Sequence, residues 1–201
     1  MTSHMCGWTA AVCLAASVLV MPAAAEIVYT PLYVSIPVGG YYNIDLNGDG
    51  ITDFTLDSKL LQGWCQSGDQ YEWSVSITPG NRNAIVTATD RAGSSYASAL
   101  LNGVPVNSAQ SFYPSASTMA GLYWGPCSTG TFGEWLNLPA RYLGLQFQDA
   151  ANQSHYGWAE VSTTAYIDQD GHLHAATMLF GFAYETVPNQ EILTGQQAGA
   201  P

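Results

Sequence analysis

Positive charge is scarce in this sequence. Four Lys and Arg residues stand against 15 Asp and Glu among 201 residues, so the formal net charge is −11. The basic residues are Lys59, Arg82, Arg91 and Arg141. A nucleic-acid-binding protein needs many such side chains on the phosphates, and an anionic membrane surface repels a chain of this charge. We therefore expect neither nucleic acid nor anionic lipid as a partner.

Catalytic motifs and long apolar runs are also missing. The sequence has no GxSxG, no HExxH and no glycine-rich phosphate loop. Glu134, Glu160 and Glu185 could supply the carboxylate pair of a glycoside hydrolase, but nothing in the sequence brings them together. No apolar run of about 18 residues follows residue 25, so no membrane-spanning helix is expected. An enzyme is therefore the least supported class.

The N-terminal segment has the pattern of an export signal. Residues 9–21 (TAAVCLAASVLVM) form an apolar run of 13, which is too short to cross a bilayer and typical of a signal-peptide core. Ala23 and Ala25 suit signal peptidase and predict a mature start at Glu26. The preceding residues contain no Lys or Arg, so a buried N-terminal helix is the alternative. The expected organisation is a signal peptide at 1–25 and one domain at 26–201.

Export decides how the cysteines are interpreted. After removal of residues 1–25, Cys65 and Cys127 remain and allow a single pairing. In an oxidising compartment a structural disulfide is the favoured interpretation. Two free buried thiols are the alternative.

The mature chain has the period of β-strands. Leu143, Leu145 and Phe147 alternate with more polar positions, and residues 173–185 are apolar or small on both faces. In that segment we expect one face to carry Ala176, Met178, Phe180, Phe182 and Tyr184. Turn residues separate the segments, which predicts an all-β fold: a single-domain antiparallel β-sandwich of jelly-roll or lectin-like type. Residues 92–140 show no clear period and contain either binding loops or several short strands.

One segment predicts a metal site. In DLNGDGITD, the residues Asp45, Asn47 and Asp49 alternate, Gly50 permits a sharp turn and Asp53 follows. Calcium takes six to eight oxygen ligands, so these side chains and the carbonyl of Ile51 form a candidate Ca²⁺ loop between two strands. The alternative is a hairpin turn stabilised by Asp and Asn side chains without an ion.

A second acidic turn lies at Asp168–Gly171, followed by His172 and His174 on one face of the next strand. This spacing suits zinc, with His155 as a possible third ligand. We expect a plain hairpin turn and exposed histidines here, because turns with such residues are common without an ion.

Four segments carry a family resemblance: IDLNGDGITDF, YLGLQF, HYGWAEV and FAYETVPNQEILTG. With the alanine-rich leader they resemble bacterial exported proteins of the PEP-CTERM (exosortase-associated) type, over residues 142–195 and less closely over 43–54. That family typically ends in a Pro-Glu-Pro motif, an apolar span and a basic cluster, whereas this sequence ends in GQQAGAP. The resemblance implies an unanchored β domain, periplasmic or secreted by a Gram-negative bacterium, and brings no catalytic residues.

Three functions follow, in order of support. The first is a secreted, non-catalytic domain with a structural calcium loop and a surface, matrix or interaction role, whose partner is an extracellular glycan or a cell-surface protein. The second is a lectin-like module in which exposed aromatic rings within 112–135 support sugar rings. The candidate rings are Tyr113, Tyr123, Trp124 and Trp135. The third is a glycoside hydrolase.

Overall fold

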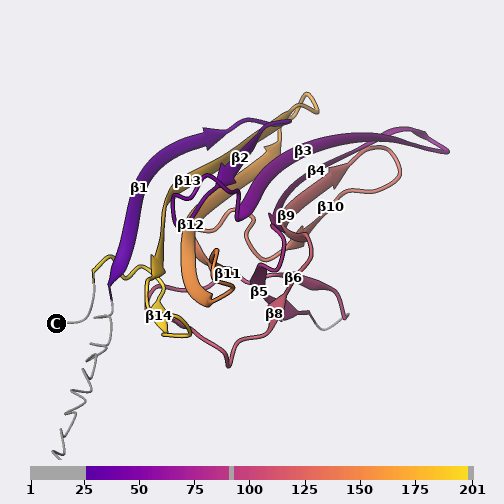
Figure 1. Cartoon of the computed structure of the whole chain (residues 1–201). Coiled ribbons are helices and arrows are strands. Elements are labelled where there is room, and N and C mark those ends of the chain that lie inside the picture. The colour runs from indigo at the N-terminus through magenta and orange to yellow at the C-terminus, as the bar shows by residue number, and fades with distance from the viewer. Residues whose placement is uncertain (1–25, 91–92, 199–201) are drawn as a thin grey trace, which may run out of the picture.

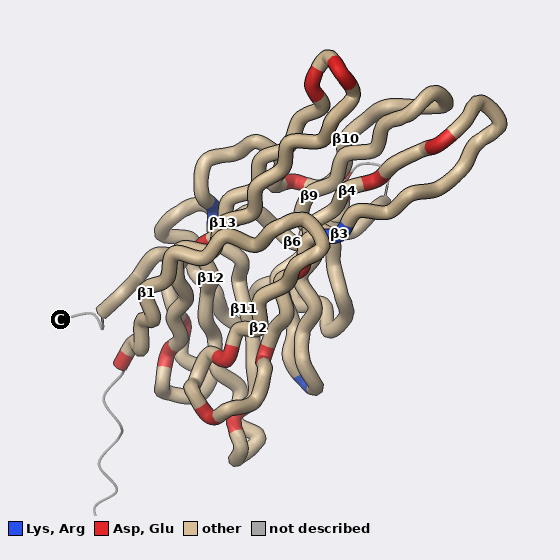
Figure 2. The backbone as a smooth tube through the Cα atoms, turned by 90° about the horizontal axis from the view of Figure 1, so that it is seen from above, with Lys and Arg blue, Asp and Glu red and all other residues tan. Residues whose placement is uncertain are grey.

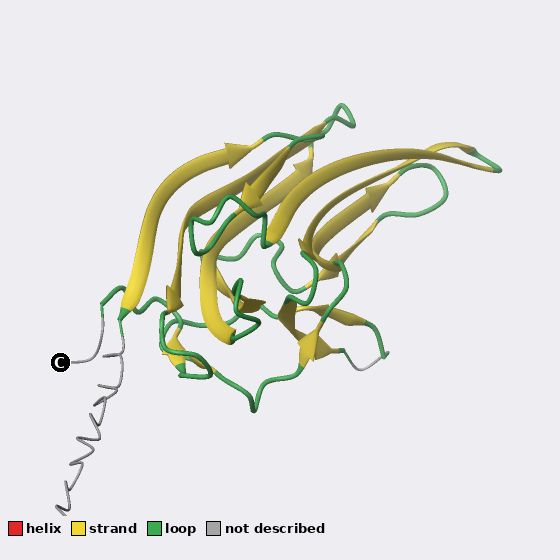
Figure 3. Cartoon of the chain, in the orientation of Figure 1, coloured by secondary structure: helices red, strands yellow, loops and turns green. Residues whose placement is uncertain are grey.

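The computed structural model of the chain describes residues 26–90 and 93–198. Every regular secondary-structure element in these residues is a β-strand, and none is a helix (Figures 1 and 3). The expected signal peptide at residues 1–25 lies outside the described residues. The strands are β1 (Ile27–Ile36), β2 (Tyr41–Ile44), β3 (Phe54–Cys65), β4 (Gly68–Pro79), β5 (Ala84–Thr89), β6 (Ser95–Ala97), β7 (Pro105–Val106), β8 (Phe112–Tyr113), β9 (Ser117–Trp124), β10 (Gly130–Gly133), β11 (Arg141–Gln148), β12 (Ser154–Ile167), β13 (Leu173–Glu185) and β14 (Ile192–Leu193).

Two antiparallel sheets pack on each other. The seven-stranded sheet has the order β1-β13-β12-β11-β5-β6 with β8 beside β5, and the five-stranded sheet has the order β10-β9-β4-β3-β2. Strands β14 and β7 form a small third sheet. Both large sheets contribute to one apolar core, which includes Leu56, Trp73, Ile77, Leu143, Leu145 and Phe147. The all-β sandwich predicted from the alternating pattern is confirmed.

Strand β13 corrects one expectation. Its register with β12 runs from Glu160 opposite Gly181 to Val161 opposite Leu179, so Phe180 has no partner and forms a β-bulge. A bulge shifts the alternation by one residue. Leu179 and Phe182 are therefore both in the core, although they stand at odd and even positions. The expectation that Phe180 and Phe182 share one face was wrong because strict alternation takes no account of a bulge.

Residues 92–140 contain short strands. Strands β6 to β10 all fall in this region, and β9 pairs with β4 in the five-stranded sheet. The sequence left open whether this region contains binding loops or several short strands, and the structure shows several short strands. Their periodicity is hidden because most are only two to four residues long.

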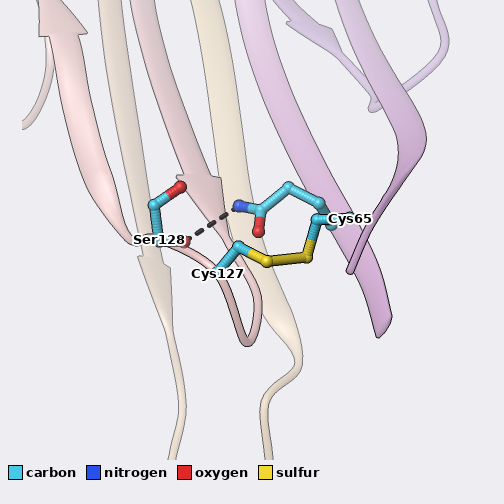
Figure 4. Close-up of a disulfide and its surroundings, with 4 residues drawn as sticks. Cys65, Cys127 and Ser128 are labelled. Carbon is cyan, nitrogen blue, oxygen red and sulfur yellow. Dashed lines mark hydrogen bonds between the residues drawn. A yellow bond between two sulfur atoms is a disulfide. The ribbon is translucent and has the colours of Figure 1, made fainter. Parts of the chain in front are cut away.

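The β3–β4 hairpin extends beyond the core. Its two strands pair from Phe54 opposite Pro79 to Cys65 opposite Gly68, and the distal part reaches past the rest of the sandwich at the right of Figure 1. Cys65 is bonded to Cys127 in the β9–β10 connection, with the Cα atoms 6.4 Å apart (Figure 4). The predicted disulfide is confirmed. It ties the tip of one hairpin to the tip of its neighbour.

Charge is distributed mainly over turns and strand ends. Figure 2 shows Asp and Glu positions on many of the turns and only a few Lys and Arg positions. In residues 26–90 and 93–198 there is no helix with the length and apolar character needed to cross a membrane.

Candidate functional site

The DLNGDGITD segment forms the tight connection between β2 and β3. The carboxylate of Asp45 accepts backbone N–H groups from Gly48 and Gly50 at 2.8 Å and from Asp49 at 3.2 Å. Gly48 and Gly50 have φ values of 73° and 86°, a left-handed conformation that favours glycine. The sequence predicts this turn because Asp can accept bonds from the backbone ahead of it while Gly supplies the required dihedral angles.

Asn47 and Asp49 face each other in the same loop. The Asn47 amide donates to the Asp49 carboxylate at 3.0 Å, and Asn47 Oδ1 accepts the Asp49 N–H at 3.1 Å. Asp49 also accepts the N–H of Ile51 at 2.8 Å. The loop therefore holds three oxygen-bearing side chains, from Asp45, Asn47 and Asp49, within a few residues of one another.

Asp53 turns into the protein at the end of the loop. It is 5% exposed, and its carboxylate accepts the Leu46 N–H at 2.8 Å and the Asn83 amide at 3.1 Å. Burial raises the pKa of Asp53, hydrogen bonds from Leu46 and Asn83 oppose this rise, and the charges of Asp45 and Asp49 add to it. A buried carboxylate near two others is an electrostatic arrangement that a cation stabilises.

Asn83 joins this loop to two other connections. Its amide nitrogen also donates to the carbonyl of Asp53 at 3.0 Å, and its Oδ1 accepts the Gln148 N–H at 3.0 Å. A polar cleft of 240 Å³ lies at this end of the sandwich, with Asp49, Asp53 and Asp149 in its lining. The β2–β3, β4–β5 and β11–β12 connections thus form one polar surface.

The β12–β13 turn holds a group that could bind a metal ion. Three possible ligand atoms, one each from Asp168, Asp170 and His172, lie within 4.8 Å of one another. Among the described residues this is the one group of three carboxylate, imidazole or thiolate side chains that lie so close together. His174 Nε2 lies 2.8 Å from Asp168 Oδ2. This contact and backbone N–H bonds lower the pKa of Asp168 to about 2. The sequence identified these residues but predicted only a plain turn.

His155 does not belong to that turn. It is 5% exposed, with Nδ1 lying 2.9 Å from the carbonyl of Glu185 and Nε2 lying 3.3 Å from the carboxylate of Asp149. His155 stacks on Phe147 in the interior. His155 therefore cannot join His172 and His174 as the possible third ligand, because it lies at the opposite end of β12.

The four candidate sugar-binding aromatics do not form one platform. Trp135 is 1% exposed and donates its indole N–H to the Ala97 carbonyl at 2.7 Å, so its expected exposure was wrong. Tyr113 lies in β8, in the other sheet. Tyr123 and Trp124 are consecutive in β9 and point to opposite faces.

The candidate hydrolase carboxylates are also separated. Glu185 is buried and accepts the backbone N–H groups of Glu26 and Val187. Glu160 stands opposite Gly181, four residues along β13 from Glu185, and Glu134 accepts the N–H of Ala99. Glu160 therefore lies about 13 Å from Glu185 along the sheet, further apart than the paired carboxyl groups of a glycoside hydrolase.

A hollow that the sequence analysis missed lies on the five-stranded sheet. It has a volume of 310 Å³, and its walls include Tyr41, Asn43, Thr55, Asp57 and Lys59 from β2 and β3. The sequence signal for this face is the alternation in residues 41–43 and 55–59, because every second side chain of a strand points to the same side of the sheet.

Comparison with protein-family models, with curated proteins and with solved structures gave no match.

Proposed function

We propose that this chain is a non-catalytic domain acting in the periplasm or outside a Gram-negative cell, and that its loop 45–53 binds one structural Ca²⁺ ion. Its role would be at a surface or in a matrix, with an extracellular glycan or a cell-surface protein as partner. The resemblance to exported PEP-CTERM proteins supports this setting.

The observation that carries the calcium proposal is the environment of Asp53. Asp53 is buried at the end of the loop that carries Asp45 and Asp49, and the pKa of Asp53 is raised by burial and by those two charges. The three carboxylates do not lie within 4.8 Å of one another in this structure, so the loop would have to close around the ion. An ionised carboxylate has about four acceptor positions, so the backbone bonds described above leave positions for a cation. Asp45, Asn47, Asp49, Asp53 and the carbonyl of Ile51 would supply oxygen ligands, and water would complete the shell.

The disulfide supports a location outside the cytoplasm. Structural disulfides persist in oxidising compartments and are rare in the cytosol of mesophiles. Cys65 and Cys127 are bonded at the tips of two hairpins. They are 62 residues apart in the sequence, which is not the spacing of a redox CxxC motif. A stapled tip suits a protein that must remain folded in a variable environment.

Calcium should raise the melting temperature of the purified domain. At about 100 times its Kd, an ion that binds only the folded state stabilises it by about 2.7 kcal/mol. At this domain size that corresponds to roughly 5–10 °C. Asp49→Ala should remove most of this gain because it deletes a carboxylate from the middle of the loop. Thermal unfolding with calcium and with a chelator measures the difference.

Asp170→Ala is the matched control, since it removes an exposed carboxylate from the other acidic turn. We expect it to keep the calcium response. A melting temperature that is the same with calcium and with chelator would contradict the proposal. So would a response that Asp170→Ala removes and Asp49→Ala leaves intact.

A further inference from the structure

The outer face of the five-stranded sheet, opposite the core, carries an unusual set of side chains. Along β3, Phe54, Leu56 and Ser58 are buried toward the core, so the alternate residues point outward. Register places Tyr41 beside Asp57, and Leu61 beside Glu72 and then Tyr123. Two hollows lie on this face, one over β2 and β3 and the other over β3, β4 and β9.

The first hollow contains a carboxylate with an unused oxygen. Asp57 is 8% exposed, and its Oδ2 forms an ion pair with Lys59, whereas its Oδ1 is buried without a hydrogen-bond partner. A buried acceptor left unpaired is unfavourable, because it has lost its hydration without gaining a hydrogen bond. Less than 1 Å² of Oδ1 is exposed, so the side chains around it must move before a ligand hydroxyl reaches it. Tyr41, which is 69% exposed, forms part of the same wall.

The second hollow also combines a tyrosine ring with a buried oxygen that lacks a hydrogen-bond partner. It has a volume of 470 Å³, and Gln70, Glu72 and Tyr123 are in its lining. Gln70 donates to the Ser128 carbonyl at 2.9 Å beside the disulfide (Figure 4), while its Oε1 is buried without a partner. Three buried side-chain atoms of the described residues lack a partner, and two of them belong to residues that line these two hollows.

The ring of Tyr123 is held flat against the sheet. It stacks with Phe132, with ring centroids 6.4 Å apart, and it covers Gly130, where no Cβ atom would fit. Phe132 covers Gly121 in the same way. Glycine at these cross-strand positions therefore fixes the orientation of both rings. A flat, fixed aromatic ring provides a contact surface for an apolar ligand face at little entropic cost.

We infer that this outer face binds a neutral oligosaccharide lying along β3, with sugar rings against Tyr41 and Tyr123 and hydroxyl groups directed to Asp57 and Gln70. A sugar ring has an apolar face for the aromatic ring and hydroxyl donors for unpaired acceptors. The charges of Asp57 and Lys59 cancel in their ion pair, so the first hollow favours neither an anionic nor a cationic ligand. The net charge of −11 also disfavours polyanions.

The spacing of the hollows suits an extended ligand. Asp57 and Leu61 are four residues apart in β3, which is about 13 Å along the strand. A ligand that spans both hollows gains from linking two weak contacts, so longer oligosaccharides should bind more tightly than a disaccharide. This inference deepens the proposed function, because it gives the chemical class of the glycan partner. It does not depend on the calcium site, because none of the residues in the inferred contacts belongs to loop 45–53.

An array of neutral oligosaccharides, from disaccharides to hexasaccharides, tests the inference with the disulfide-bonded protein in the presence of chelator. We expect binding that increases with chain length. For the tightest binder, calorimetric titration should show that Tyr41→Ala and Tyr123→Ala each weaken the Kd about tenfold. Asp57→Asn should weaken it as well. Tyr41 is exposed, so its replacement should leave the melting temperature unchanged.

Tyr166→Ala is the matched control, because Tyr166 is 60% exposed but lies in the other sheet. Its Kd should equal that of the unaltered protein. Absence of binding to every neutral oligosaccharide would overturn the inference. Binding that survives both Tyr41→Ala and Tyr123→Ala would also overturn it, because the ligand would then lie elsewhere.

Discussion

Removal of the Cys65–Cys127 bond should lower the free energy of unfolding by about 4 kcal/mol, the largest single effect that we expect. The bond closes a loop of 62 residues, and the entropy model assigns this amount to the loss of such a constraint in the unfolded chain. For a domain of this size the melting temperature should fall by roughly 8–16 °C. The measurement is thermal unfolding of the Cys65→Ser/Cys127→Ser double variant.

Reduction of the unaltered protein provides the control. It should lower the melting temperature by the same amount, whereas the double variant should not respond to reductant. The distal part of β3 carries exposed Leu60, Leu61 and Trp64, so the loss of the bond should also free this part of the sheet before the core unfolds. An unchanged melting temperature after reduction would contradict a stabilising role for the bond.

Asn83→Ala should destabilise the fold by about 3 kcal/mol. Asn83 is 4% exposed, and its removal leaves both the Asp53 carboxylate and the Gln148 N–H without this partner in a buried region. Each loss of this kind costs about 1–3 kcal/mol. The melting temperature should fall, and calcium affinity should weaken because Asp53 loses the group that orients it.

Asn81→Ala is the control for this effect, since Asn81 is exposed in the same connection. We expect its melting temperature to stay close to that of the unaltered protein. If Asn83→Ala proved equally harmless, the three connections would not form the cooperative unit that their hydrogen bonds indicate.

Local patterns were enough to predict much of the fold. Alternation in residues 142–147 placed Leu143, Leu145 and Phe147 in the core, where all are fully buried. The pairing of Cys65 with Cys127 followed once residues 1–25 were interpreted as a signal, because two cysteines allow one bond. The turn in loop 45–53 was also predictable, since Asp, Asn and Gly determine it within a few residues.

The remaining features depend on contacts that are distant in the sequence. The burial of Trp135 depends on Ala97, which is 38 residues away, and no local period reports it. The bulge at Phe180 depends on the register with β12, and the outer-face hollows depend on which strands pair with β3. Loops and bulges of this kind follow from tertiary packing, which a single sequence does not display.

Calorimetric titration of the metal-free domain with CaCl₂ tests the central claim most directly. We expect one Ca²⁺ ion to bind per chain, with binding lost in Asp49→Ala and retained in Asp170→Ala. Absence of binding by the unaltered protein, or equal binding by Asp49→Ala, would contradict a calcium site at loop 45–53.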